Sequence, residues 1–431
     1  MTGNLKDFCC SDDFLRKFSF VVICITVIVQ LLVVAYHWGD TQYSDAGAYI
    51  KIAKECYTKG LWYPMSDNIY DSYIWSLGYI NILILQLKLF GTIDLNPILN
   101  ILFQLGILFN IYKIGVRLFS CRIAYVSVIL YSCLYSNIMI VLPALTELPF
   151  LFVVLTAFNL CLYPTGCNLF IAGILFTLAN TIRPLVLLFV FAIIVNFVFF
   201  KQIKLKNYFA LILGAFLSVL TISFWTKSNT GYYICQASTS GYNMIMAAND
   251  KANGGVINIF SNSEDLGWID NEDSLTYKEK DAIWKKRAID WIIDNPMSYL
   301  GLYFKKLLFL WADDSWSDRY FKEKSTLGAT LNKEGLSINL ILEDILPRIL
   351  KSLFYYFVLC LSLFSIVFLR RECLTPKGIL LLLLLIGTAA TCIFPSGFRY
   401  HQPYLFIIVL WASLGIDALL ERFYMCKTNH R

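Results

Sequence analysis

Residues 37–49 read His-Trp-Gly-Asp-Thr-Gln-Tyr-Ser-Asp-Ala-Gly-Ala-Tyr and follow directly on the first apolar run of the chain, residues 18–36. That run is long enough to cross the hydrocarbon core of a bilayer as a helix. It is too long for a removable signal peptide and lacks a small-residue cleavage site, so we expect it to remain as a signal anchor. The polar stretch then begins at one face of a membrane, with His37, Asp40 and Asp45 close together.

The composition extends this interpretation to the whole chain. Of its 431 residues, 58% are hydrophobic and 15% are charged, whereas soluble domains carry about 25% charged residues. Long apolar runs recur along the sequence, and in lipid such runs must satisfy their own backbone hydrogen bonds as helices. We therefore predict an all-α polytopic membrane protein. The net charge of +6 comes from basic residues in short loops, which indicates orientation in the membrane and no nucleic-acid partner.

The basic loops also predict the topology, because Lys and Arg gather on the cytoplasmic side. The chain has five basic segments. The last four fall on the same side of the membrane as the N-terminal one only if the apolar run 74–90 does not cross the membrane and instead lies at its surface or re-enters. The segments contain Lys6, Arg16 and Lys17; Lys113, Arg117 and Arg122; Lys201, Lys204 and Lys206; Arg370, Arg371 and Lys377; and Arg422, Lys427 and Arg431.

This choice predicts about ten membrane-spanning helices, with both termini in the cytoplasm. The expected spans are 18–36, 96–118, 122–141, 147–163, 168–182, 184–200, 207–226, 346–369, 377–394 and 402–421. The chain then divides into an N-terminal transmembrane module (1–226) with a first outer loop (38–95), a long outer loop (227–345) and C-terminal transmembrane helices (346–431).

Two outer segments have helical patterns. Residues 45–59 read as an amphipathic helix, with Ser44 as its N-cap and Gly60 at its end. In the long loop we expect one helix over 276–294 and a second, apolar one over 297–311 that carries Lys305 and Lys306 and rests on the membrane surface.

The cysteines show no metal-ligand spacing. Most of the thirteen cysteines fall in spans or in loops on the cytoplasmic side. Cys56 and Cys235 are the two placed on the outer side, so at most one intramolecular disulfide is expected there.

Asp45 is the first candidate for chemistry. A carboxylate at a helix start commonly does no more than satisfy free N–H groups and the helix dipole. Its setting beside Asp40 and His37, with Tyr49 one turn later, favours a general base, because an ionised carboxylate can accept a proton.

Glu147 is the second candidate, in the segment Thr146-Glu147-Leu148-Pro149 at the outer end of a span. It is either part of a helix-capping motif or, as an ionisable group entering a span, a functional residue. Two acids on one face could hold a divalent metal cation or orient a hydroxyl.

Two arginines are predicted on the same face, Arg183 before Pro184 and Arg399 in the segment Arg399-Tyr400-His401. A single arginine at that depth usually extends to lipid headgroups. Two of them beside the acids suggest an anionic ligand, because guanidinium matches phosphate geometry. His401 is either a metal ligand or an ordinary interfacial residue. The sequence has no phosphate-binding glycine loop, no GxSxG and no HExxH motif, which makes nucleotide-driven chemistry an unfavourable interpretation.

These four pieces, in this order and on one side of the membrane, resemble the GT-C superfamily of glycosyltransferases, close to the protein mannosyltransferase and lipid A aminoarabinose transferase families (glycosyltransferase family 39-like). The resemblance implies a GT-C-like bundle with juxtamembrane helices in the first outer loop. It also implies a catalytic aspartate resembling Asp45 and a second acid resembling Glu147. Many relatives have an acid after the first Asp where this chain has Ala46, so the resemblance carries no metal role over to that position.

The implied reaction moves a sugar from a polyprenyl-phosphate donor to an acceptor hydroxyl of a glycan, lipid or protein on the extracytoplasmic side of the cell membrane, with inversion. Asp45 would deprotonate the acceptor. Arg183 and Arg399 would stabilise the leaving phosphate, with Lys305 or Lys306 as helpers, and Glu147, Asp40 and His401 would shape the acceptor side or a cation site.

Two rival functions would use similar residues. A transporter or flippase of lipid-linked glycans would place its charges near the bilayer midplane or in broken helices of repeated halves, which this sequence does not show. A surface-polysaccharide polymerase would concentrate arginines in two large outer loops, whereas here the candidate acids lie in short ones.

Overall fold

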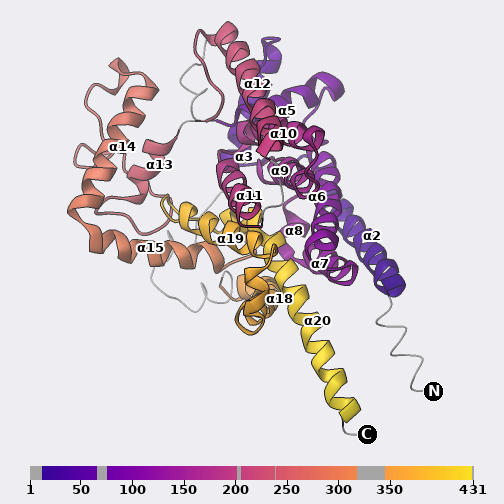
Figure 1. Ribbon diagram of the computed structural model, residues 1–431. Coiled ribbons are helices and arrows are strands. Elements are labelled where there is room, and N and C mark those ends of the chain that lie inside the picture. Colours follow the sequence, from indigo (N-terminus) through magenta and orange to yellow (C-terminus); the bar gives the residue numbers. More distant parts are fainter. Residues whose placement is uncertain (1–11, 66–74, 201–204, 238, 318–344, 430–431) are drawn as a thin grey trace.

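The computed structural model describes residues 12–65, 75–200, 205–237, 239–317 and 345–429, and the regular elements within these ranges are all helical (Figure 1). Parts of the predicted N-terminal tail, of the first outer loop (66–74), of the third basic segment (201–204) and of the long loop (318–344) lie outside the described residues.

The helices are α2 (Asp12–Tyr36), α3 (Ser44–Thr58), α5 (Leu77–Phe90), α6 (Asn96–Leu118), α7 (Cys121–Cys133), α8 (Tyr135–Met139), α9 (Glu147–Leu162), α10 (Gly166–Ile182), α11 (Val186–Phe200), α12 (Leu205–Thr230), α13 (Ser240–Ala247), η2 (Glu272–Ser274), α14 (Tyr277–Asp294), α15 (Pro296–Trp311), α18 (Leu346–Phe368), η5 (Arg370–Leu374), α19 (Gly378–Thr391), η6 (Phe398–Tyr404) and α20 (Leu405–Asn429).

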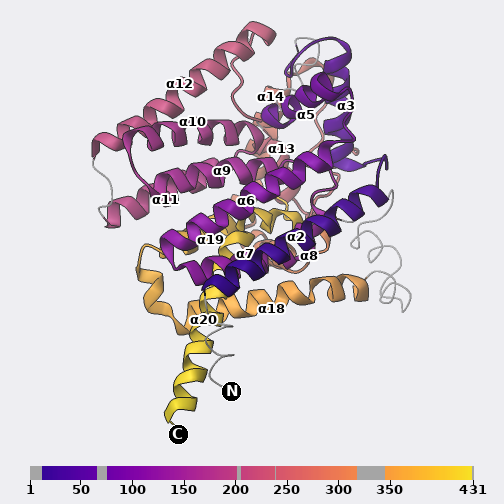
Figure 2. The same ribbon diagram turned by 90° about the vertical axis from the view of Figure 1, so that its right-hand side faces the viewer.

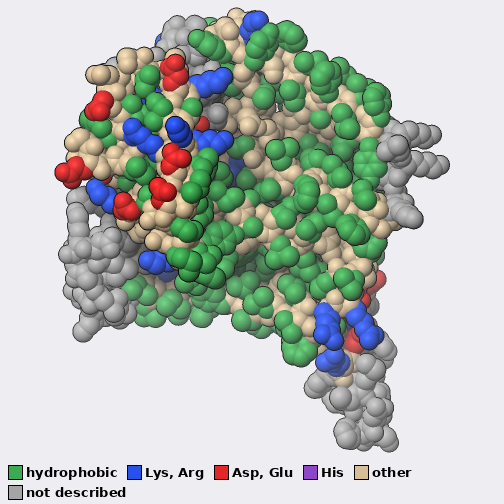
Figure 3. All heavy atoms as spheres, turned by 60° about the vertical axis from the view of Figure 1, so that its left-hand side comes forward, with side chains coloured by type: hydrophobic (Ala, Val, Ile, Leu, Met, Phe, Trp, Pro, Cys, Tyr) green, Lys and Arg blue, Asp and Glu red, His purple; other side chains and the backbone are tan. Residues whose placement is uncertain are grey.

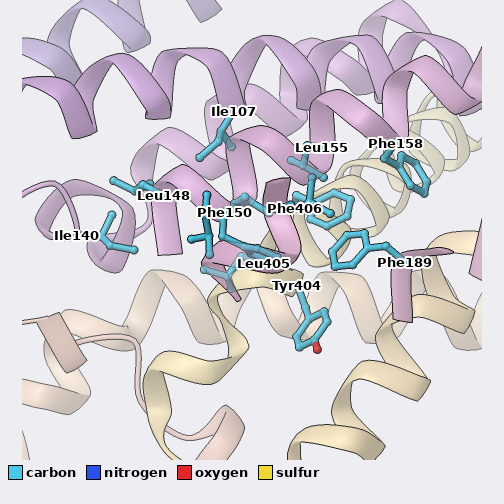
Figure 4. Packing of buried hydrophobic residues seen from close by; sticks show 14 of the residues in the cluster. Ile107, Ile140, Leu148, Phe150, Leu155, Phe158, Phe189, Tyr404, Leu405 and Phe406 are labelled. Atoms are coloured by element: carbon cyan, nitrogen blue, oxygen red, sulfur yellow. The ribbon is translucent and has the colours of Figure 1, made fainter. Parts of the chain in front are cut away.

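Most of these helices form one bundle. In Figure 2, α2, α6, α9, α10 and α18 run side by side, and the start of α2 and the end of α20 lie at the same end. The interior of the bundle includes four fully buried side chains from four helices (Figure 4): Ile107 of α6, Phe158 of α9, Phe189 of α11 and Phe406 of α20. Such close packing holds helices together in lipid, where apolar burial gives little net drive.

The number of spanning helices is not settled at ten. Five helices (α2, α6, α12, α18 and η6 with α20) are long and apolar enough to cross a membrane, and six others are apolar but shorter. Each predicted span coincides with one of these helices, but 122–141 is broken at Leu134, which is extended. The Asn137 amide donates to the Tyr131 carbonyl and so satisfies a group that the break releases.

The run predicted not to cross forms α5, which packs against α3 and α10. Its 14 residues span about 21 Å, less than the roughly 30 Å of a hydrocarbon core. Because α19 has the same length, length alone does not distinguish a surface helix from a short span here, and the placement of α5 remains a prediction.

The described part of residues 227–345, predicted to be a long outer loop, forms a small body with its own core, beside the bundle in Figure 1. Trp284, Ala288 and Trp291 line the buried face of α14, as the sequence pattern predicted, and Thr276 begins that helix with a capping box to Glu279. Figure 3 shows charged side chains concentrated over this body, while the adjoining face of the bundle is almost entirely apolar.

The start of α3 differs from the prediction. Ser44 does not cap the helix, because it is already helical residue one with a left-handed φ of 57° and the N-cap position belongs to Tyr43. The turn before it is tight: a Cβ on Gly47 would lie 2.5 Å from the Gln42 carbonyl oxygen. At the other end, Gly60 follows the last turn with a φ of 73°, as expected for a glycine that terminates a helix.

Candidate active site

The structure brings together four of the predicted site residues, from the start of α3, the start of α9, the end of α10 and η6. Arg399 Nη2 donates to Asp45 Oδ2 at 2.5 Å although the two residues are 354 positions apart. Arg183 Nη1 donates to Glu147 Oε1 at 2.8 Å, and Arg399 Nε lies 3.8 Å from the same oxygen. The result is a network of two acids and two arginines, here called the acid–arginine cluster.

The two acids differ in exposure. The Glu147 side chain is 1% exposed, whereas that of Asp45 is 35% exposed. The second carboxylate oxygen of Glu147 is buried and has no hydrogen-bond partner among the described residues. Glu147 therefore lies at the base of the cluster and Asp45 at its mouth, where an incoming molecule could reach it.

Aromatic rings enclose the cluster. The guanidinium carbons of Arg183 and Arg399 lie 5.8 and 5.2 Å from the centre of the Tyr400 ring, within cation–π range. Tyr49 makes edge contacts with Trp75 and Tyr79 at 5.3 and 5.2 Å. Burial, and then the charge of Asp45, raises the pKa of the Tyr49 phenol above its usual value, so this hydroxyl stays protonated and can donate a hydrogen bond.

Hydrogen bonds between side chains and backbone groups hold these elements in place. The Gln42 side chain donates to the Leu142 carbonyl at 3.4 Å and accepts from the Ala144 N–H at 2.7 Å, which joins the first outer loop to the segment before α9. The Ser76 hydroxyl lies 2.8 Å from the Ile182 carbonyl and so fixes the start of α5 against the end of α10, next to Arg183. Gln42 and Ser76 could not be found from the sequence, because an isolated polar residue in a loop forms no recognisable pattern.

The structure places His401 away from the acid–arginine cluster, in a different polar group. Its ring is fully buried and stacks on Trp311 and Tyr355. Nδ1 lies 2.8 Å from the Leu310 carbonyl and Nε2 lies 3.4 Å from Asp314 Oδ1. The other oxygen of Asp314 accepts from the Ser136 N–H. His401 thus ties η6 to α15 and α8, and its ring nitrogens both have protein partners.

The residues do not fit a metal site as they stand. Among the described residues no group of three or more His, Cys, Asp or Glu side chains could hold an ion. The predicted candidates Glu147 and His401 have separate partners, and the two arginines beside Glu147 would oppose a cation. Asp313 and Asp314, two acids after α15 that the sequence analysis missed, bond instead to Ser315, Ser352 and the groups named above.

The predicted helpers are also arranged differently. Lys305 is exposed, whereas Lys306 is 0% exposed, its Nζ has no hydrogen-bond partner in the described part of the chain and it lies 4.7 Å above the Tyr299 ring. Burial lowers the pKa of Lys306 to about 8. Asp40 is half-exposed and bonds to His37 at 2.8 Å, not to the cluster. In the described part of the chain no hydrogen bond or ion pair joins these three residues to Asp45 or Glu147, so their predicted roles at the donor or acceptor remain hypotheses.

The two cysteines considered for a disulfide are both free. Cys56 is buried on the core face of α3, and this burial raises the pKa of its thiol to about 11. A buried thiol of that kind is unreactive and behaves as a small apolar side chain.

Comparison with known proteins supports the fold. No protein-family model and no curated protein match the chain. Among solved structures, it is similar to the archaeal oligosaccharyltransferase AglB from Archaeoglobus fulgidus in complex with an inhibitory peptide and a dolichol-phosphate, with a TM-score of 0.50 and 12% identity over 97% of this chain and 52% of that one. The apo form of the Archaeoglobus fulgidus oligosaccharyltransferase gives a TM-score of 0.50 and 10% identity over 96% and 52% of the two chains.

These similarities define the class to which the fold belongs. The helical membrane class predicted from the composition is correct, and the chain shares the fold of the Archaeoglobus fulgidus oligosaccharyltransferase at low sequence identity. The chain spans about half the length of the oligosaccharyltransferase that it matches, so the particular family member is not identified by this likeness.

Proposed function

We propose that this protein is a membrane glycosyltransferase that moves a sugar from a polyprenyl-phosphate donor to an acceptor hydroxyl on the extracytoplasmic face of the cell membrane. The observation that carries the proposal is the acid–arginine cluster, in which Arg399 bonds to Asp45 and approaches Glu147. The fold adds support, since it is shared with an enzyme solved with a dolichol-phosphate. The acceptor is a glycan, a lipid or a protein.

The chemistry assigned to the cluster has two parts. The acceptor oxygen attacks the anomeric carbon and loses its proton to the Asp45 carboxylate, while the bond from that carbon to the phosphate oxygen breaks and the leaving phosphate keeps the electron pair. Attack from the side opposite the phosphate inverts the anomeric centre. Arg183 and Arg399 carry the charges that stabilise the leaving phosphate, because guanidinium groups bind phosphate oxygens in pairs.

Arg399 is held by Asp45 in this structure, so the guanidinium group occupies the carboxylate oxygen that would accept the proton. A donor phosphate that attracts Arg399 would release Asp45 Oδ2 for the acceptor. Glu147 is too buried to meet an acceptor directly, and we assign it the positioning of Arg183 and Arg399. The Tyr400 ring contacts both guanidinium groups. No step in this mechanism uses a metal ion.

The first test is transfer of radiolabel from short-chain polyprenyl-phosphate mannose, glucose or galactose to endogenous acceptors in membranes. Asp45→Asn should lower transfer by about 10²–10⁴-fold, the usual contribution of a general base. Glu55→Gln is the matched control, because Glu55 lies on the same helix as Asp45 but pairs with Lys59. Full activity of Asp45→Asn at normal expression would overturn the mechanism.

The same assay separates the rival functions. A transporter or flippase of lipid-linked glycans gives no transfer with any donor, whereas a polysaccharide polymerase extends a glycan chain in many steps. The charged cluster lies where α9 begins and α10 ends, not in the interior of a helix, and this position favours chemistry at a membrane surface over passage through the midplane.

A further inference from the structure

A cavity lies against the face of α3 that carries Gly47, Lys51 and Lys54. Its volume is about 450 Å³, within the roughly 300–1,000 Å³ of ordinary ligand pockets. Its walls come from the end of α2, the segment 37–42, one face of α3 with Gly47, Lys51 and Lys54, and the connection from α5 to α6 with Asp94. Because a helix turns about 100° per residue, Lys54 points about 180° away from Asp45. The cavity is therefore separate from the acid–arginine cluster.

Within the described residues, the acidic groups that line the cavity have hydrogen-bond partners, whereas the lysines do not. Asp40 bonds to His37 at 2.8 Å, and Asp94 accepts from the Thr92 hydroxyl at 2.9 Å. Lys51 and Lys54 are exposed, and no ion pair or hydrogen bond engages their ammonium groups in the described ranges. Since they lie three residues apart on one helix face, both can reach the same ligand. Among the described residues, the charged groups of the cavity that lack a partner are thus the two ammonium groups, which favours a ligand with an anionic group.

The lining also indicates what carries the negative charge. The apolar residues Val34, Ile93 and Leu142 are 3%, 7% and 2% exposed, so they close the floor and offer little surface to a lipid chain. The accessible groups are mixed: Thr41 and Asp40 are polar, and Trp38, which is 52% exposed, offers its aromatic ring. A hydroxylated molecule with an acidic group matches both features better than a phospholipid does.

We propose that this cavity binds an acidic saccharide, with its carboxylate held by Lys51 and Lys54, as the part of the acceptor remote from the reacting hydroxyl. The assignment of an acceptor rests on the proposed function. Gln42 lines the cavity and lies three residues before Asp45, a separation of at most about 10 Å along the backbone. A glycan of a few sugar units seated in the cavity can thus pass around the start of α3 to Asp45.

Binding is measured on the purified full-length protein in detergent by microscale thermophoresis, with digalacturonate as the acidic probe, maltose as the neutral one and dihexanoyl-phosphatidylglycerol as the lipid one. Digalacturonate should bind and maltose should not. The double variant K51Q/K54Q should weaken digalacturonate binding at least tenfold. Lys59→Gln, directly after the end of the same helix, is the matched control, because Lys59 pairs with Glu55 and does not line the cavity.

Lysine acetylation read by mass spectrometry gives a second measurement, in which digalacturonate should protect Lys51 and Lys54 but not Lys59. The proposal is overturned if the wild type binds none of the probes, if it binds only the phosphatidylglycerol, or if K51Q/K54Q binds digalacturonate as well as the wild type does. Asp45→Asn should bind digalacturonate normally. A protein that binds the probe but transfers no sugar would therefore refute the proposed function and leave the anionic site standing.

Discussion

At the scale of single residues, the two acid–arginine pairs of the cluster have different energetics. Glu147 and Arg183 are 1% and 12% exposed, whereas Asp45 and Arg399 are 35% and 21% exposed. Removing one partner of a buried pair leaves an uncompensated charge, which costs far more than the loss of an exposed pair. The buried pair should therefore govern stability, and the exposed pair should be free to exchange partners during a reaction.

This difference predicts the effect of Arg183→Gln. The variant should lose about 3 kcal/mol of stability, because the Glu147 carboxylate then keeps only the more distant Arg399. Adding Glu147→Gln should recover most of that loss, since no buried charge is left alone. Thermal unfolding in detergent measures both. The expectation fails if the double variant is less stable than Arg183→Gln.

Lys306 gives a prediction that depends on pH. Its ordinary pKa of 10.5 falls to about 8 in the folded protein, and that separation corresponds to about 3 kcal/mol. Below pH 8 the lysine is charged in both the folded and the unfolded chain, so the cost of burying the charge is fully present. Between pH 8 and 10.5 only the unfolded chain holds the proton, so folding becomes more favourable as the pH rises.

Lys306→Met should accordingly raise the melting temperature at pH 7, and this gain should shrink by pH 10. Lys305→Met serves as the control, because Lys305 is the exposed neighbour on α15 and should show no such change. If Lys306→Met destabilises the protein at pH 7, the buried ammonium has a favourable partner. That result would support the predicted role of Lys306 in binding the phosphate of the donor.

At the scale of elements, the site depends on how α3 begins. Asp45 follows a turn so tight that Gly47 approaches the Gln42 carbonyl, and Gln42 is bonded to the segment before α9. The positions of Asp45 and Glu147 are thus connected through the Gln42 side chain. A change in this turn would alter both acids at once.

Gly47→Ala tests that connection. The new Cβ would lie 2.5 Å from the Gln42 oxygen, so the backbone must shift, at a cost of about 1–3 kcal/mol. We expect transfer activity to fall at least tenfold, because a displacement of about 1 Å in a catalytic group has effects of that size or larger. Gly166→Ala is the control, since a Cβ there meets open space. Equal activity of the two variants would show that the turn does not position Asp45.

The sequence predicted the elements well where a pattern repeats and poorly where single contacts decide. The apolar periodicity found α14 and its buried tryptophans, and it found the start of α9 at Glu147. The break at Leu134 was missed because it depends on Asn137, a lone polar residue within an apolar run. The position of His401 was missed for the same reason: its partners Leu310 and Asp314 are 91 and 87 residues away, and one sequence does not show such contacts.

At the scale of the whole molecule, one ion pair shows which segments share an end of the helix bundle. Arg122 and Asp417 lie 3.0 Å apart. The pair joins the start of α7 to the later part of α20, at the end of the bundle where α20 terminates (Figure 2). The segment of basic residues around Arg122 therefore shares a side with the end of α20. Whether that side is cytoplasmic depends on α5, since one more crossing before α6 would reverse it.

Fusions of the truncated chain to alkaline phosphatase, which is active only outside the cytoplasm, decide this. If α5 (Leu77–Phe90) stays at the outer surface, a fusion after Thr92 should be active and one after Phe119 inactive, because α6 alone lies between them and is long enough to cross. If α5 crosses, the two results exchange. A fusion after Gly60 should be active in both cases, since α2 precedes it, and so controls for export. The first pattern would place the basic loop inside and Asp45 outside, as the positive-inside rule requires, whereas the second would contradict the predicted topology while leaving Asp45 on the outer face.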